Sequence, residues 1–244
     1  MYHGQKGWQQ RKEADIRKTL WECRGGKVLL QYYLKKGHGG NMDSRNEIKD
    51  EMAEALTGMG YALVDAGKFK EALTLAKNLN KKDIYSAFEV AAAAYAGMGD
   101  FRKAVSTLEK GVRKDPGYWI NWELLGSYRS EHGDYSGAEE AYLEALKCKN
   151  AWVDSIYYNR AVAAARSGDS DRALKLLEQV VDPELDEPAS MLRITLHTKM
   201  GRPDQALGLI DRCLKKRWHG HDKRAILKRF KQKRDWVHDC MGQD

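Results

Sequence analysis

Apolar and polar positions along this chain follow the period of an α-helix. In the stretch SEHGDYSGAEEAYLEAL, Ala138 is followed by Tyr142 four residues later and by Ala145 three residues beyond. This spacing places the three side chains on one helical face. No stretch alternates apolar and polar residues one by one, and the chain contains only four prolines. The pattern predicts an all-α chain.

The same arrangement of residues returns at a nearly constant interval. Related segments are DAGKFKEALTLAKNL, GMGDFRKAVSTLEKGV, RSGDSDRALKLLEQVV and KMGRPDQALGLIDRCL. The first alanines of the five segments are Ala72, Ala104, Ala138, Ala173 and Ala206, separated by 32, 34, 35 and 33 residues. A fixed period near 34 residues is typical of an array of helical hairpins, each with a helix A, a tight turn and a helix B.

The residues before each alanine predict the turn of the hairpin. Glycine stands five residues earlier in every copy, at Gly67, Gly99, Gly133, Gly168 and Gly201. Glycine adopts the left-handed conformation at little cost, so it ends helix A. In three copies an aspartate follows, Asp100, Asp134 or Asp169, and its side chain suits the N-cap of helix B. Because such hairpins pack closely, small residues such as Gly126 are expected opposite the alanines.

The clearest copy spans Trp119–Trp152. Its distinctive residues are Trp122, Leu125, Gly126, Ala138 and Tyr142. Their order resembles the tetratricopeptide repeat, whose pattern is W-x2-L-G-x2-Y…A-x3-F…P, although Arg129 replaces the tyrosine and Asn150 the proline.

The resemblance implies a right-handed superhelical solenoid of antiparallel helix-turn-helix repeats over residues 52–220. The repeats lie near 53–84, 85–118, 119–152, 154–186 and 187–220. Residues 1–51 are expected to form an N-terminal helical extension or a degenerate repeat. In residues 221–244, Ile226, Leu227, Phe230 and Val237 share one helical face. This face predicts a basic C-terminal capping helix, followed by a tail, which covers the last hairpin.

The resemblance also implies a function. In tetratricopeptide proteins, side chains of helix A line a concave groove that binds peptide segments of partner proteins. The offsets of that family place nine residues in the groove: Tyr61, Glu89, Ala93, Glu123, Ser127, Ser130, Tyr158, Asn159 and Val162. A solvated or merely packed helix face is the alternative interpretation of these residues. The resemblance therefore predicts a non-enzymatic scaffold or adaptor whose partner is another protein.

One subtype of the family grips the C-terminal carboxylate of a heat-shock protein with a clamp of cations and asparagines. Asn159 stands at the asparagine position of that clamp. Glu123 and Ser127 stand where lysine and asparagine are expected, and Pro188 and Leu192 stand where lysine and arginine are expected. Without cations a carboxylate ligand has no charge partner, so the sequence argues against the clamp. Glu89 and Glu123 instead indicate a groove that tolerates basic or neutral segments.

Charge is unevenly distributed along the chain. Residues 1–50 carry 11 Lys/Arg against 6 Asp/Glu, residues 51–211 carry 20 against 25, and residues 212–244 carry 11 against 4. The basic-patch candidates of the last stretch are Lys215, Lys216, Arg217, Lys223, Arg224, Lys228, Arg229, Lys231, Lys233 and Arg234. The middle of the chain is thus mildly acidic between two basic ends.

The basic end supports alternative functions. Trp218, Phe230 and Trp236 lie in or beside it, and basic residues with interleaved aromatics can contact phosphates and stack on bases. Nucleic-acid or acidic-partner binding is one alternative, and self-assembly into a homo-oligomer through the end repeats is another. Pentatricopeptide RNA readers are also built from hairpins of about 35 residues. The repeated Gly-Asp-aromatic turns favour the tetratricopeptide class.

The sequence shows no motif of catalysis or of cofactor binding. GxSxG, P-loop, HExxH and dinucleotide patterns are missing. His219, His221, His238 and Cys240 match no zinc-finger spacing. The N-terminus lacks the apolar core of a signal peptide, and no run is apolar enough to span a membrane. We therefore expect no enzymatic activity, no cofactor, no metal site and no membrane insertion, and a cytoplasmic location.

Overall fold

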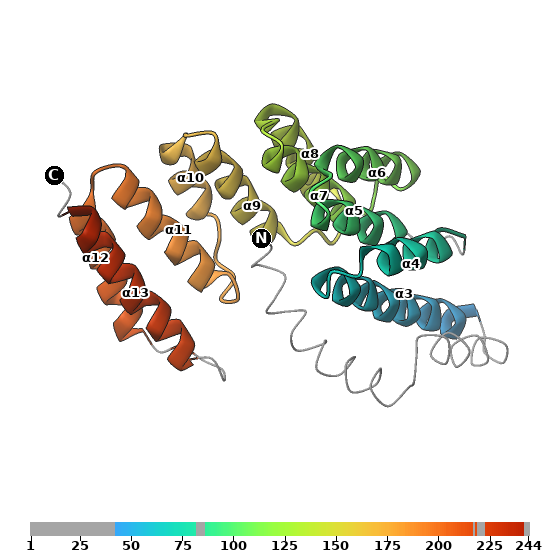
Figure 1. The fold of residues 1–244 in the computed structure, drawn as a ribbon, viewed down its shortest axis with the longest axis horizontal. Helices are drawn as coiled ribbons and strands as arrows, with labels where there is room; N and C mark the ends of the chain where they lie inside the picture. The colour runs from blue at the N-terminus through green and yellow to red at the C-terminus, as the bar shows by residue number, and fades with distance from the viewer. Residues whose placement is uncertain (1–41, 82–85, 217, 219–222, 242–244) are drawn as a thin grey trace. The chain divides into compact units, whose positions relative to one another are not determined.

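The computed structural model describes residues 42–81, 86–216, 218 and 223–241, with side chains from residue 53 on. Every regular element among these residues is an α-helix (Figure 1), which confirms the predicted all-α fold. Most of the predicted N-terminal extension, residues 1–41, lies outside the described residues. Helix α3 (Met42–Asp65) crosses the boundary expected at residue 51. None of the described helices is both long enough and apolar enough to cross a membrane.

The chain divides into two compact units between Ala151 and Trp152. The N-terminal unit contains α3, α4 (Phe69–Lys81), α5 (Ala87–Gly97), α6 (Phe101–Lys114), α7 (Trp119–Glu131) and α8 (Tyr135–Lys147). The C-terminal unit contains α9 (Val153–Arg166), α10 (Ser170–Leu177), α11 (Asp186–Lys199), α12 (Pro203–Lys215) and α13 (Lys223–Met241). Within each unit, every helix packs against the next one along the chain. Each unit is therefore a stack of helical hairpins.

The turns of the hairpins have the conformation that the sequence predicts. The glycines that end the first helix of each hairpin have φ between 65° and 89°: Gly67, Gly99, Gly133, Gly168 and Gly201. The Asp134 carboxylate accepts a hydrogen bond from the Gly137 N–H at 2.9 Å, so it caps α8. Asp100 and Asp169 cap α6 and α10 in the same way. The turns are thus specified by residues next to them in the sequence.

The recurrent alanines lie in the core of the hairpins. Ala72, Ala104, Ala138, Ala173 and Ala206 are all fully buried. The helices approach closely at Gly126, where an added Cβ would lie 2.7 Å from the Tyr142 ring. At Gly60 an added Cβ would lie 2.6 Å from a Val90 methyl group. Only a small side chain in one helix leaves room for the large side chain that faces it.

We expect Gly126→Ala to lower the free energy of unfolding by about 1–3 kcal/mol, because the new methyl group displaces the Tyr142 ring. Gly208→Ala is the matched control, since no atom lies within 4 Å of a Cβ placed there. The control should raise stability by about 0.5–1 kcal/mol through helix propensity. Urea unfolding followed by circular dichroism measures both. Shifts of the same sign would show that the contact at Gly126 is not tight.

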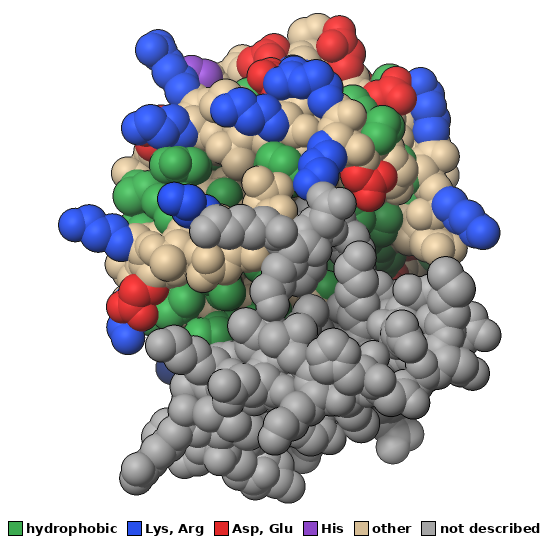
Figure 2. All heavy atoms as spheres, turned by 90° about the vertical axis from the view of Figure 1, so that its right-hand side faces the viewer, with side chains coloured by type: hydrophobic (Ala, Val, Ile, Leu, Met, Phe, Trp, Pro, Cys, Tyr) green, Lys and Arg blue, Asp and Glu red, His purple; other side chains and the backbone are tan. Residues whose placement is uncertain are grey.

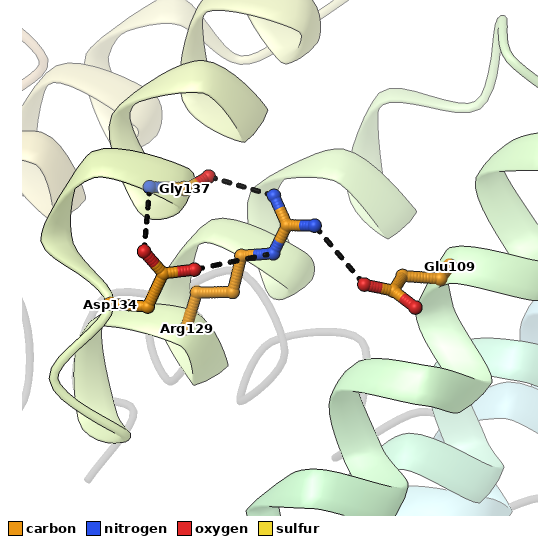
Figure 3. A network of polar contacts seen from close by, with 4 residues as sticks. All are labelled: Glu109, Arg129, Asp134 and Gly137. Carbon is orange, nitrogen blue, oxygen red and sulfur yellow. Dashed lines mark hydrogen bonds and ion pairs between the residues drawn. The ribbon is translucent and has the colours of Figure 1, made fainter.

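Arg129 stands where the repeat pattern has a tyrosine, and it joins three helices of the N-terminal unit (Figure 3). Its guanidinium donates to the Gly137 carbonyl at 3.0 Å and to Glu109 Oε1 at 3.1 Å. Its Nε lies 3.9 Å from a carboxylate oxygen of Asp134, the residue that caps α8. The departure from the pattern thus replaces an aromatic contact with a polar network between α6, α7 and the start of α8.

Helix α13 closes the described part of the C-terminal unit. Phe230 and Val237 are fully buried on its inner face. The Phe230 ring stacks on Trp218 with centroids 5.5 Å apart, and the Trp218 indole donates to the Cys213 carbonyl at 2.7 Å. These side chains belong to one cluster with Ile194 and Ile210, from α11 and α12.

Candidate binding surface

The nine groove candidates come from one helix of each hairpin. Tyr61 lies on α3, Glu89 and Ala93 on α5, and Glu123, Ser127 and Ser130 on α7, all in the N-terminal unit. Tyr158, Asn159 and Val162 lie on α9 in the C-terminal unit. Exposed fractions are 2% for Glu89, 5% for Ala93, 1% for Glu123 and 3% for Ser130. The other five are half-buried. The candidates thus do not form a solvated helix face.

Two carboxylates and three tyrosines gather in the N-terminal unit, and we call them the acid–tyrosine cluster: Tyr61, Glu89, Tyr118, Glu123 and Tyr128. The Tyr118 hydroxyl donates to Glu89 Oε2 at 2.5 Å. Burial raises the pKa of Tyr61 well above its ordinary value, and the charge of Glu89 raises it further. Tyr61 lies on α3, Glu89 on α5, and Glu123 and Tyr128 on α7, and Tyr118 directly precedes α7. The cluster thus brings together side chains of three successive hairpins.

Glu89 has an unusual pKa within this cluster. Burial raises the pKa of its carboxyl to about 7, the Tyr118 hydrogen bond lowers it, and the charge of Glu123 raises it. Among the described residues, no cation contributes to this shift. Glu89 therefore carries a proton for a substantial fraction of the time near neutral pH.

Among the described residues, two hydroxyls of the groove candidates have no hydrogen-bond partner. They are the Tyr61 hydroxyl and the Ser130 hydroxyl, and both oxygen atoms are buried. Ser130 lies two turns after Glu123 on α7. Buried polar atoms without partners are uncommon in folded proteins and call for an explanation such as a ligand or a water molecule. The Asn121 amide is also unpartnered, but it lies against Gly111 of α6.

Two further candidates, Ser127 and Tyr158, have surroundings of a different kind. The Ser127 hydroxyl lies 3.1 Å from the Tyr142 hydroxyl of the same hairpin, within hydrogen-bond distance. Burial raises the pKa of Tyr158, and the positive charge of Arg166 partly offsets this rise. Ser127 therefore contributes to the hairpin itself, while Tyr158 places a large half-buried ring on α9.

Part of the predicted basic patch is used within the C-terminal unit. Arg229 donates to both carboxylate oxygens of Glu187, at 2.5 and 2.8 Å. Arg234 pairs with Asp211, and Lys216 with Asp186. The exposed candidates without such a pair are Lys215, Lys223, Arg224, Lys228 and Lys231. Lys233 is half-buried and Arg217 lies outside the described residues.

The aromatic residues of the basic end are mostly unavailable for stacking on bases. The rings of Trp218 and Phe230 face the core, with exposed fractions of 9% and 0%. Trp236 is half-buried, and the Lys233 ammonium lies 3.6 Å from its ring centroid. Elsewhere charge is mixed, because Lys/Arg and Asp/Glu side chains are interspersed with hydrophobic ones on the face drawn in Figure 2.

Family models match the centre of the chain. Two models described as "Tetratricopeptide repeat" match residues 90–155 and 155–179. A TPR repeat-containing protein of Pseudomonas aeruginosa is 38% identical over 52 residues, 21% of this chain and 50% of that protein. A photosystem I assembly protein of Prochlorococcus marinus is 35% identical over 89 residues, 35% of this chain and 51% of that protein. The chain thus spans about half the length of these two relatives.

A third relative is the heat-shock protein cognate co-chaperone sgt12 of Aspergillus fumigatus. It is 29% identical over 114 residues, 41% of this chain and 33% of the relative. The solved structure of a tetratricopeptide repeat protein from Parabacteroides merdae superposes with a TM-score of 0.59 and 17% identity, over 87% of this chain and 86% of that one. A TPR protein of Thermus thermophilus gives 0.55 and 19%, over 74% and 98%.

The matched models cover the hairpins with the most regular turns, and the solved structures have the same fold. Proteins of this family are generally protein-interaction scaffolds and typically have no enzymatic activity. The alanine of its repeat pattern is buried in every hairpin of this chain. Residues 90–179 of this chain are tetratricopeptide repeats.

Proposed function

We propose that this protein is a non-enzymatic adaptor that binds a segment of a partner protein along the α3, α5 and α7 side of its N-terminal unit. The acid–tyrosine cluster is the observation that carries this proposal. It gathers ionisable and hydroxyl groups of three hairpins at one place, and it leaves the buried Tyr61 hydroxyl without a partner. Stacked hairpins that stabilised only themselves would not need such a group.

The side chains of this surface are expected to make two kinds of contact with a bound segment. The half-buried Tyr61 offers a large apolar ring with one polar end, which suits an anchor of an interface. The carboxylates and hydroxyls of the same unit fix the register of a bound segment through directional hydrogen bonds. Glu123 and Ser127 disfavour capture of a terminal carboxylate, so we do not extend to this chain the clamp of some co-chaperones.

A pull-down with the full chain tests the proposal. A triple variant of that side, Tyr61→Ala, Glu89→Gln and Glu123→Gln, should recover the partner at least about tenfold less than the wild type. The control is Lys223→Gln with Lys228→Gln, which removes exposed cations of α13 and should leave recovery unchanged. Equal recovery by the triple variant and the wild type would show that the surface is assigned wrongly.

The dependence of affinity on salt concentration distinguishes this function from binding through the exposed lysines of α13. Contacts with phosphates weaken steeply between 50 and 200 mM salt, by about three orders of magnitude for six or more contacts. The dissociation constant of the recovered partner should change by less than about tenfold over the same range if it binds the α3, α5 and α7 side.

A further inference from the structure

We propose that the acid–tyrosine cluster is a receptor for one cationic side chain, a lysine ammonium or an arginine guanidinium, of the segment that the protein binds. This inference rests on the proposed function and names the chemistry of the ligand at that surface. It assigns the cluster a specific contribution, which is to select basic segments over neutral and acidic ones.

The carboxylates supply the first part of the argument. Glu89 and Glu123 are 2% and 1% exposed, and the charge of one raises the pKa of the other. A buried carboxylate is normally paired with a cation or neutralised by a proton. The described residues hold Glu89 through the Tyr118 hydroxyl, a neutral donor, at 2.5 Å. A cation brought by a ligand would replace the proton that Glu89 retains near neutral pH.

The hydroxyls supply a second and independent part. The Tyr61 hydroxyl is buried and has no partner, so its oxygen is open to accept a hydrogen bond. An ammonium has three donors and a guanidinium has five. Either group therefore has enough donors for more than one acceptor of the cluster. The aromatic rings of the cluster add an attraction that anions and neutral groups lack.

The burial of the two carboxylates limits which ligand side chains can reach them. Because both carboxylates are almost fully buried, a ligand group must reach them while its own backbone stays outside. Lysine and arginine carry their charge on stems of three or four methylene groups, so they can do this. Short polar side chains cannot, and a carboxylate ligand would add a negative charge beside Glu89, whose own ionisation burial already disfavours.

A peptide library displayed on phage and selected against the full chain tests the inference. Peptides enriched by the wild type should carry lysine or arginine at one fixed position. Replacing that residue with norleucine or citrulline should weaken binding at least tenfold. The same replacement should have less than a twofold effect on a Glu89→Gln, Glu123→Gln double variant. A control with Glu71→Gln and Glu140→Gln removes two exposed carboxylates of the same unit and should behave as the wild type.

Proton release gives a readout that a merely structural role would not change. Calorimetry at pH 7 in buffers of different ionisation enthalpy should show about half a proton released per complex, since the cation lowers the pKa of a half-protonated Glu89. Selected peptides that keep their affinity without the cation overturn the inference and leave the proposed function intact. If the wild type enriches no peptide, the proposed function fails as well.

Carboxyl NMR of the unliganded full chain identifies the source of the cation. Residues 1–41 contain nine Lys/Arg and three Asp/Glu, so they could supply the same chemistry. A Glu89 pKa near 7 is expected if a partner brings the cation. A pKa well below this value, rising when those nine residues are replaced by glutamine, would overturn the assignment to a partner.

Discussion

A Phe230→Ala variant will lose about 3–5 kcal/mol of unfolding free energy in the C-terminal unit, the usual range for a fully buried phenylalanine. Phe230 is 0% exposed, and its ring stacks on Trp218 against Ile194 and Ile210. The last hairpin of a repeat array has no neighbour to cover its apolar side, so α13 provides this cover. Hydrogen exchange of the amides of α11 and α12 should accelerate strongly in this variant.

The matched control lies on the same helix. Lys231 follows Phe230 directly but is exposed, so Lys231→Ala should change stability by less than about 0.5 kcal/mol. If the two variants exchange at the same rate, burial of Phe230 does not hold α13 in place. If amides of the N-terminal unit accelerate as much as those of α12, the effect is not confined to the C-terminal unit.

A Glu89→Gln variant will be more stable than the wild type at pH 8 by about 3 kcal/mol, with little difference at pH 4.5. In the folded chain the pKa of Glu89 is raised to about 7, above the value near 4.5 of an unfolded chain. The folded state therefore binds the proton more tightly, and the wild type loses stability as pH rises from about 4.5 to 7. Glutamine remains neutral throughout, and its carbonyl can still accept the Tyr118 hydrogen bond.

Urea unfolding at several pH values between 4.5 and 8 measures this difference. In the part of the chain that the structure describes, the groups that act on the Glu89 carboxyl are Tyr118, Glu123 and Tyr61, and none of these three is a cation. Glu140→Gln removes an exposed carboxylate, so it should give the same small difference from wild type at every pH. A stability difference for Glu89→Gln that does not vary with pH would show that Glu89 is ionised throughout.

The hairpins could be predicted from the sequence because their signals are local. Gly133, Asp134 and Ala138 lie within six residues of one another, and each acts on its own turn or hairpin. Pro203 begins α12, as its missing N–H allows. The buried alanines follow from the same short pattern. The fold therefore needs no knowledge of distant contacts.

The acid–tyrosine cluster could be predicted only in part, because its members are far apart in the sequence. The repeat offsets predict that Glu89 and Glu123 line the groove, but they give no indication that both are almost fully buried. The hydrogen bond of Glu89 comes from Tyr118, 29 residues later. Arg129 was recognisable as a departure from the pattern, yet its partner Glu109 lies 20 residues earlier. Charge and burial at such sites depend on how hairpins stack.

Phe230 shows how one residue can support two predictions. Its place in a basic, aromatic-containing stretch suggested stacking on bases, and its helical face suggested burial against the last hairpin. The structure places the ring in the core, because Ile226, Leu227 and Val237 share its face and a helix buries its apolar side together. For Phe230, the helical periodicity of apolar residues therefore predicts the position of the ring correctly, whereas the composition of the stretch does not.

The aspartate caps have a consequence for the evolution of the chain. Asp134 finds its hydrogen-bond donor three residues later in the same hairpin, and Asp100 and Asp169 do the same. The hydrogen bonds that cap these three helices are made within single hairpins. An in-frame gene duplication or deletion of one hairpin would therefore leave every other turn correctly encoded, so that the number of copies can change before their sequences diverge.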